Sequence, residues 1–191
     1  LYGPLADRFG RRKPLLFGVL LFTVASVICS MASSLEWLIA ARFLQALGGC
    51  AGIVISRAVV RDLCDPLASA KAFSQLMLVM GVAPILAPAI GGVLLTQFGW
   101  QSIFICLALF GALCGVAVAL WLPETLHQDA PRSALPQAPS KYLEILKDRQ
   151  FVIHALTGGL AIAGMFAYIA GSPFVFIQLY GVPAEHYGWL F

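Results

Sequence analysis

The sequence predicts an all-α membrane protein that crosses the bilayer several times. Of its 191 residues, 60% are hydrophobic and only 11% are charged, whereas soluble domains carry about 25% charged residues. The apolar residues gather in runs that are long enough to cross a bilayer, since about 20 residues suffice. Short polar segments separate these runs. The net charge of only +3 argues against a basic field that would attract nucleic acid.

Four complete spans and one longer apolar stretch follow one another along the chain. The predicted spans are residues 15–32, 38–60, 73–96 and 103–122, and the longer stretch is 151–180. Asp65 can cap the helix of the third span, and Pro66 suits its first position because an N–H there would have no helical partner. Pro123 stops the fourth span, and Pro173 predicts a kink in the longer stretch.

The segment 123–150 differs from the rest of the chain. Its first half is rich in proline and charge, which predicts a flexible linker. Its second half, 141–150, sets apolar residues among charges, which predicts a short amphipathic helix at the membrane surface with Ser140 as its cap. After the longer stretch we expect a turn over 181–188 and a further span that begins near Tyr187. We also expect the chain to be an internal part of a longer protein, since it begins without Met.

The distribution of basic residues predicts which loops face the cytoplasm. Eleven of the twelve lysines and arginines gather in three segments, around residues 8–13, 57–71 and 132–149. The short loops that alternate with these segments contain neither lysine nor arginine. Because loops rich in lysine and arginine stay in the cytoplasm, we expect residues 1–13 and 124–150 to be cytoplasmic.

The most highly charged stretch lies at the start of the chain, directly before the uncharged first span. A carboxylate among arginines should form charge-assisted hydrogen bonds that hold this loop in one geometry. Glycines on either side of the carboxylate suit a sharp turn. A plain topology signal with no further role is the alternative. The residues expected to form this loop are Gly3, Asp7, Arg8, Gly10, Arg11 and Arg12.

Arg42 is a charged residue well inside the span 38–60, whereas Arg57 lies near the cytoplasmic end of that span. An arginine in the hydrocarbon costs about 2.5–3.5 kcal/mol on insertion scales, so it needs a partner or a wet cavity. Gln45, Gly49, Gly52 and Ser56 recur at helical spacing and place one polar, small face beneath it. We expect Arg42 and Gln45 to line a cavity and to couple transport to protons. A side chain that reaches the outer interface is the alternative.

The third span carries a run of small residues and prolines. Small residues recur at every fourth position on one ridge of the helix, and the prolines do so on the neighbouring ridge. This lets a second helix approach closely in lipid. Two internal prolines also invite a bend, so the run suits a packing face or a hinge. Its residues of interest are Gly81, Pro84, Pro88, Gly91 and Gly92.

Aromatic side chains in the longer stretch are candidates for a substrate cavity, and packing is the alternative for each of them. The candidates are Phe166, Tyr168 and Phe174. The five cysteines show no C-x-x-C pair, so the sequence predicts no metal site.

Several of these runs resemble motifs of the major facilitator superfamily. Residues 3–12 fill every fixed position of G-x-L-A-D-R-x-G-R-R, the loop between the second and third helices. Residues 38–49 resemble the fourth-helix motif, whose arginine is implicated in proton coupling. Residues 88–92 resemble the P-x-x-G-G antiporter motif of proton-linked drug exporters, with Ala87 where the family usually has glycine. Residues 164–174 resemble the seventh helix of the bicyclomycin and chloramphenicol resistance (Bcr/CflA) group, and Leu122–Leu126 resembles the P-E-T ending of the sixth helix.

The resemblance implies a fold of six plus six helices, of which this chain supplies the end of helix 2 to the start of helix 8. Residues 1–122 would belong to the N-terminal bundle, 123–150 to the cytoplasmic linker and 151–191 to the C-terminal bundle. The implied function is multidrug efflux across a bacterial inner membrane by a monomer that exchanges a small-molecule drug for protons. No cofactor is implied, because the proton gradient supplies the energy. The resemblance also implies that the loop at residues 3–12 latches the two halves in the outward-facing state.

The sequence leaves other functions open. A solute:proton symporter shares the fold, although the P-x-x-G-G run argues against it. Asp62 and Asp65 suggest a membrane-embedded enzyme with a metal, but no third carboxylate or histidine lies nearby in the sequence. Arg8 to Lys13 is too closely wedged against a span to bind a nucleic-acid duplex.

Overall fold

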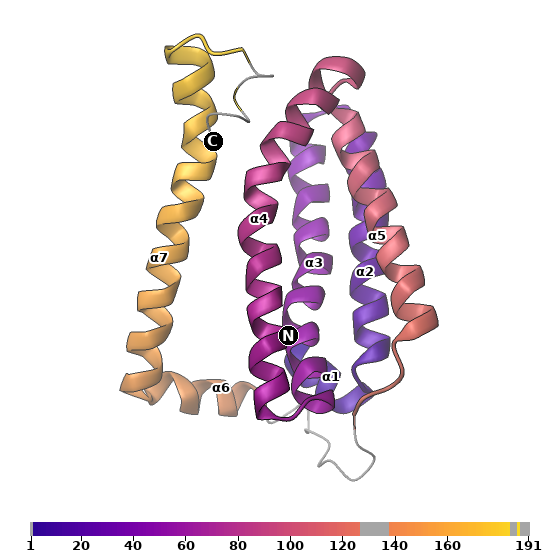
Figure 1. Cartoon of the computed structure of the whole chain (residues 1–191), viewed down its shortest axis with the longest axis vertical. Helices are drawn as coiled ribbons and strands as arrows, with labels where there is room; N and C mark the ends of the chain where they lie inside the picture. Colours follow the sequence, from indigo (N-terminus) through magenta and orange to yellow (C-terminus); the bar gives the residue numbers. More distant parts are fainter. Residues whose placement is uncertain (1, 127–137, 184–186, 188–191) are drawn as a thin grey trace.

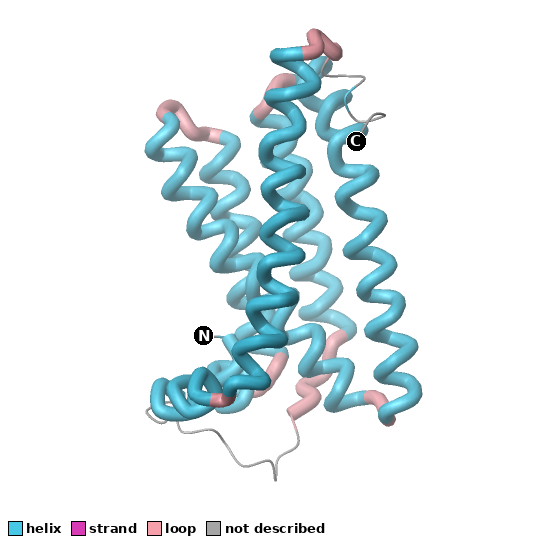
Figure 2. Tube along the Cα trace, turned by 90° about the vertical axis from the view of Figure 1, so that its left-hand side faces the viewer, coloured by secondary structure: helices cyan, strands magenta, loops and turns pink. Residues whose placement is uncertain are grey.

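The computed structural model describes residues 2–126, 138–183 and 187. Figure 2 shows that helices and their connecting loops make up this part of the chain. In chain order the helices are α1 (Tyr2–Phe9), α2 (Arg12–Ser30), α3 (Leu35–Leu63), α4 (Pro66–Phe98), α5 (Gln101–Trp121), α6 (Ala138–Lys147), α7 (Arg149–Pro173) and the π-helical η2 (Phe174–Leu179).

Five helices of the described part are long and apolar enough to cross a membrane: α2, α3, α4, α5, and α7 continued by η2. This confirms the predicted fold class. The helices α2, α3, α4 and α5 correspond to the four predicted spans. Each extends beyond its predicted apolar run at one end or both, because polar residues next to the run continue the helix. The predicted cap of the third span is confirmed, since the Asp65 carboxylate accepts the backbone N–H of Ala68 at 2.7 Å and Pro66 occupies the first position.

The start of α6 differs from the prediction. The helix begins at Ala138, so Ser140 lies inside its first turn and the prediction of Ser140 as the cap is wrong. Pro139 explains the earlier start, because a proline is tolerated in the first helical turn, where its N–H has no partner to lose. The next cap is Asp148, whose carboxylate accepts the backbone N–H of Gln150 at 2.9 Å and begins α7. Figure 1 shows α6 lying across the end of α7.

Close packing in the described part centres on α2, which contacts α3 and α5 along its length. A Cβ added at Gly48 would lie 2.4 Å from the Phe22 backbone nitrogen and 2.6 Å from the Gly18 carbonyl oxygen. The backbones of α2 and α3 therefore touch, as small residues permit in a membrane. On the other side of α2, a Cβ at Gly111 of α5 would lie 2.5 Å from the Thr23 hydroxyl.

The helices α4 and α7 are far more exposed than α2 and α3. Only 6% of the best 18-residue window of each is buried, against 33% for α2 and 28% for α3. In Figure 1, α7 stands apart from α2, α3 and α5. Lateral support for α7 therefore has to come from lipid or from polypeptide other than α2, α3 and α5.

The predicted kink coincides with a change of helix type. The α-helix ends at Pro173 and π-helical hydrogen bonding follows, for example from the Tyr180 N–H to the Val175 carbonyl at 3.1 Å. Pro173 has no N–H to continue the α-helical ladder, which explains the place of the change. Residues 127–137 of the predicted linker, residues 184–186 and 188 of the predicted turn, and the predicted final span except Tyr187 lie outside the described residues.

Candidate functional site

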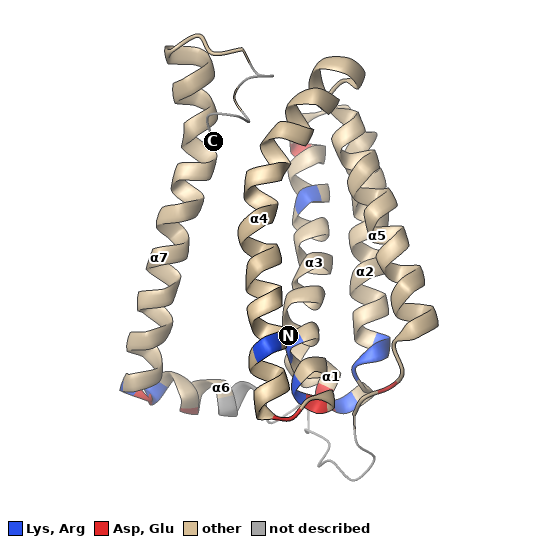
Figure 3. Cartoon of the chain, in the orientation of Figure 1, with Lys and Arg blue, Asp and Glu red and all other residues tan. Residues whose placement is uncertain are grey.

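Charged residues gather at one end of the long helices, where α1, α6 and the starts of α2, α4 and α7 lie (Figure 3). This is the end that the basic loops predict to be cytoplasmic. Two polar groups result. One is at this end and ties several helix termini together, and the other lies within the membrane-spanning part of α2 and α3.

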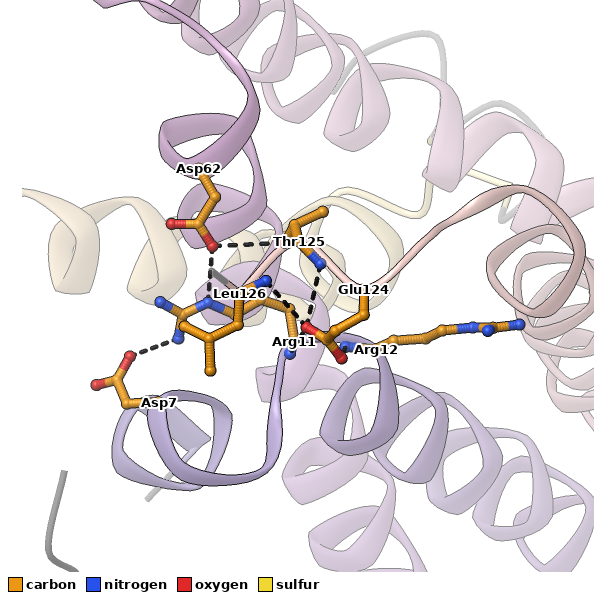
Figure 4. Close-up of polar contacts among 7 residues, drawn as sticks. All are labelled: Asp7, Arg11, Arg12, Asp62, Glu124, Thr125 and Leu126. Carbon is orange, nitrogen blue, oxygen red and sulfur yellow. Dashed lines mark hydrogen bonds and ion pairs between the residues drawn. The ribbon is translucent and has the colours of Figure 1, made fainter. Parts of the chain in front are cut away.

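The first group is centred on Arg11, between α1 and α2 (Figure 4). Its guanidinium donates to the Asp7 carboxylate of α1, and its Nε donates to the Asp62 Oδ2 of α3 at 2.9 Å. Only 10% of the Arg11 side chain is exposed. Burial alone would lower the pKa of this guanidinium, but the hydrogen bonds and charges of Asp62 and Asp7 outweigh burial and raise it, so Arg11 stays protonated.

Glu124 attaches the segment after α5 to the same turn. Its carboxylate accepts the backbone N–H of Arg11 at 2.7 Å and that of Arg12 at 3.3 Å, at the N-terminus of α2. It also accepts the N–H groups of Thr125 and Leu126, each at 3.1 Å. Burial would raise the pKa of the Glu124 carboxyl, but these four donors together lower it below its usual value. A carboxylate at a helix N-terminus is also favoured by the helix dipole.

The conformation of Gly10 explains why the chain can turn here. Its φ is +89°, a conformation that glycine adopts freely. A Cβ at this position would also lie 2.3 Å from the Glu124 carboxylate. Gly3 differs, because it lies inside α1 and an added Cβ would meet nothing within 4 Å. The prediction of one tight loop is therefore wrong: residues 2–9 are helical and the turn is confined to Gly10 and Arg11, because only Gly10 has a backbone that breaks the helix.

Neither Arg8 nor Arg12 forms an ion pair with Asp7 in the described part of the chain. Arg8 lies over the Phe9 ring, with its Cζ 5.4 Å from the ring centroid. Arg12 donates to the carbonyl oxygen of Ala119 near the end of α5. Together with a 3.4 Å hydrogen bond from the Thr125 hydroxyl to Asp62, these contacts join the ends of α1, α2, α3 and α5. We name Asp7, Arg11, Asp62, Glu124 and Thr125 the cytoplasmic network.

Sequence reasoning did not assign Asp62 or Glu124 to this site. Asp62 pairs with a residue 51 positions away, and Glu124 with one 113 positions away. A charged residue directly after an apolar span is the signal that points to both. The sequence did not say which arginine each carboxylate would meet.

The second polar group is centred on Arg42 of α3. Its Nη1 donates to the Gln45 Oε1 at 2.6 Å, and its Cζ lies 5.8 Å from the centroid of the Phe104 ring on α5. The Gln45 Nε2 donates in turn to the Ser26 Oγ of α2 at 2.6 Å. The sequence predicted that Arg42 and Gln45 share one helix face, but not their hydrogen bond, and it missed Ser26 because a serine in an apolar run gives no signal of its partner.

The proline-rich run lies in α4, which remains helical through both prolines. Pro84 and Pro88 are half-buried and Gly92 is buried, so they share the covered face of the helix. Gly81 is exposed, and an added Cβ at Gly81 or Gly91 would meet nothing within 4 Å. The role of this run as a packing face or a hinge stays a prediction.

The predicted aromatic residues separate into two groups. Tyr168 lines a cavity of about 730 Å³ beside α7 and η2, together with Ser172, Phe176 and Tyr180. Phe166 and Phe174 are more than half exposed and do not line this cavity. Periodicity explains the split, since Tyr168, Ser172 and Phe176 are four residues apart and share one face. The Ser172 hydroxyl lies 2.6 Å from the Tyr187 hydroxyl.

Comparisons with known proteins agree with this architecture. A family model described as Major Facilitator Superfamily matches residues 1–191. The chain is 41% identical over its whole length to an uncharacterized MFS-type transporter, YdgK, of Bacillus subtilis. It is 31% identical over its whole length to a bicyclomycin resistance protein homolog of Haemophilus influenzae, and 32% identical over 97% of its length to the multidrug resistance protein MdtL of Escherichia coli. These matches cover 48%, 48% and 46% of the relatives, so the chain spans about half their length.

Proposed function

Because the chain belongs to the major facilitator superfamily, a family of membrane transporters and not of enzymes, we propose that it forms part of a drug exporter driven by protons. The chain is a multi-pass membrane protein with bacterial relatives. Two of those relatives are named for resistance to bicyclomycin or to several drugs. A small-molecule drug is therefore the proposed substrate, and the proton gradient is the proposed source of energy.

The observation that carries this proposal is the environment of Arg42. Within the described part of the chain its partners are a neutral amide and an aromatic ring, and it forms no ion pair there. A positive charge without a counter-charge lowers the pKa of any carboxylate that approaches it. Arg42 can therefore favour release of a proton from such a carboxylate, which is the electrostatic step that proton-coupled exchange needs.

The parts of the chain fit a division of labour in this proposal. We assign residues 1–122 to one helix bundle, 123–150 to the linker and 151–191 to the start of a second bundle, in a transporter that works as a monomer. Transport by alternating access needs two bundles that rock about a central site. The cavity lined by Tyr168 is then one wall of the drug site, and the run from Gly81 to Gly92 is a surface along which helices slide.

The cytoplasmic network also has a role in the proposal. It joins the ends of four helices of one bundle through charges that are largely compensated. Such a rigid end can dock as a unit against the second bundle in the outward-facing state. Opening the transporter toward the cytoplasm then requires separation of the docked surfaces rather than rearrangement inside the bundle.

Transport by the complete transporter in liposomes tests the proposal. Radiolabelled bicyclomycin and a pH-sensitive dye are followed together after a pH gradient is imposed. Exchange predicts that drug and protons move in opposite directions, and that collapse of the gradient stops drug accumulation. Movement of drug and protons in the same direction would identify a symporter. Drug movement that ignores the gradient would exclude proton coupling.

A further inference from the structure

Ser26 is the point at which the Arg42 group is attached to a second helix. Ser26 is 0% exposed and Gln45 is 2% exposed, so both side chains are buried between α2 and α3. The Ser26 Oγ accepts from the Gln45 Nε2 at 2.6 Å and donates to the Phe22 carbonyl oxygen at 2.7 Å. Loss of such a buried hydrogen bond is costly in free energy, because the partner left behind has neither water nor a protein group to bond to.

The hydrogen bonds that link Arg42, Gln45 and Ser26 can be arranged in only one way. The Arg42 guanidinium only donates, so the Gln45 oxygen has to face it. The NH₂ group of Gln45 then faces α2 and needs an acceptor. Because the Ser26 proton is used on the Phe22 carbonyl oxygen, a lone pair of the Ser26 hydroxyl is free to accept. The direction of the Gln45 amide is therefore set from both ends.

A backbone contact between α2 and α3 lies beside these hydrogen bonds and keeps their geometry fixed. Gly48 lies one turn beyond Gln45, at the place where α3 touches the backbone of α2. The distance between the two helices therefore cannot change without changing the hydrogen bond from Gln45 to Ser26. A displacement of α2 is transmitted through the amide to the guanidinium of Arg42.

We propose that Ser26 is a positioning residue, which holds Arg42 through Gln45 in the orientation needed for proton coupling. The inference rests on the proposed function, since it assigns a further residue to the same step. Ser26 touches neither drug nor proton in this account. Its loss leaves the NH₂ group of Gln45 without its acceptor, so the amide turns and Arg42 loses its fixed acceptor.

Two rates measured on the complete transporter test this role. The first is drug efflux driven by an imposed pH gradient, and the second is exchange of labelled for unlabelled bicyclomycin at equal pH, which needs no net proton transfer. We expect Ser26→Ala to lower the gradient-driven rate about tenfold, as loss of one buried hydrogen-bond partner implies. The exchange rate should stay near that of the wild type, because the helices still pack.

Matched variants separate positioning from packing. Ser26→Cys keeps the size of the side chain but is a weak acceptor, so it should share the defect of Ser26→Ala. Ser30→Ala removes a hydroxyl one turn along α2 that bonds to the Val27 carbonyl of its own helix, and both rates should be unchanged. Equal loss of both rates in Ser26→Ala would reduce Ser26 to a packing residue and overturn the inference, as would full gradient-driven efflux.

A measurement that does not depend on transport completes the test. The nitrogen resonances of the Arg42 guanidinium are assigned by their absence in Arg42→Lys. Resolved Nη resonances in the wild type that merge in Ser26→Ala support positioning, even if the wild type shows no proton-driven transport and the proposed function fails. Identical guanidinium spectra in the two proteins contradict it.

Discussion

Arg11 and Arg42 show how one chain treats the same side chain in two opposite ways. Arg11 sits at the end predicted to be cytoplasmic, between two carboxylates, Asp7 and Asp62. Arg42 sits within a span and, in the described part of the chain, donates to the Gln45 amide, lies beside the Phe104 ring and forms no ion pair. Among the described residues, carboxylates compensate the charge of Arg11 and none pairs with Arg42.

The difference indicates what each group can do. A compensated charge with short hydrogen bonds fixes geometry and has little field left to act on other groups. An uncompensated charge held by neutral partners keeps a field that can act on other groups. The cytoplasmic network is therefore suited to holding helix ends together, and the Arg42 group to changing the protonation of a carboxylate.

The largest expected effect on stability comes from the backbone contact beside the Arg42 group. Gly48→Ala places a Cβ against the backbone of α2, which cannot move aside as a flexible side chain can. We expect a loss of about 1–3 kcal/mol in unfolding free energy, typical of overpacking. The adjacent Gly49→Ala is the control, since its Cβ would lie 3.6 Å from the Phe22 ring in ordinary contact. Equal stability of the two variants in a detergent unfolding assay would show that α2 and α3 are not locked together.

A smaller effect should separate the two carboxylates around Arg11. The Asp62 side chain is 21% exposed and that of Asp7 is 47% exposed, so water screens Asp7 more strongly. Asp62→Asn should cost about 1–2 kcal/mol, and Asp7→Asn less than about 1 kcal/mol. In the complete transporter Asp7→Asn should still lower efflux at normal expression, because the docking surface changes. Wild-type efflux and accessibility in Asp7→Asn would leave the charged residues around Asp7 as a topology signal only.

The smallest expected effect concerns Glu124, which is exposed and screened by water. Its pKa is lowered in the folded protein, so its contribution to stability is present above the unfolded pKa and is lost as pH falls through the folded pKa. We expect the stability of the wild type to decline below about pH 4.5, near the usual pKa of a glutamate. Glu124→Gln should lose that part of the acid dependence. Parallel pH curves for the two proteins would show that the four backbone hydrogen bonds do not favour the charged carboxyl.

The features that sequence predicted are those with a local cause. Hydropathy placed the spans, and the adjacent pair Asp65 and Pro66 fixed the start of α4, because a cap acts within one turn. The wrong prediction of Ser140 as a helix cap also has a local cause, since Pro139 allows the helix to begin earlier.

The features that sequence did not predict depend on contacts between distant residues. The pairing of Arg11 with Asp62, and the attachment of Glu124 to the start of α2, join residues whose separation is set by the lengths of whole helices. Ser26 is an extreme case. Its hydroxyl is one polar group in an apolar run, and only the contact between α2 and α3 shows that it faces Gln45.

The account depends most on the charge of Arg42, which forms no ion pair among the described residues, and one measurement tests that charge directly. Efflux driven by an imposed pH gradient is measured in proteoliposomes for Arg42→Gln and Arg42→Lys, together with binding of the same drug. Lysine keeps the charge but loses the planar set of donors, so Arg42→Lys should retain partial gradient-driven efflux. Arg42→Gln should bind drug and show no gradient-driven efflux. Full gradient-driven efflux by Arg42→Gln would contradict the account and leave Arg42 as an anchor for its helix.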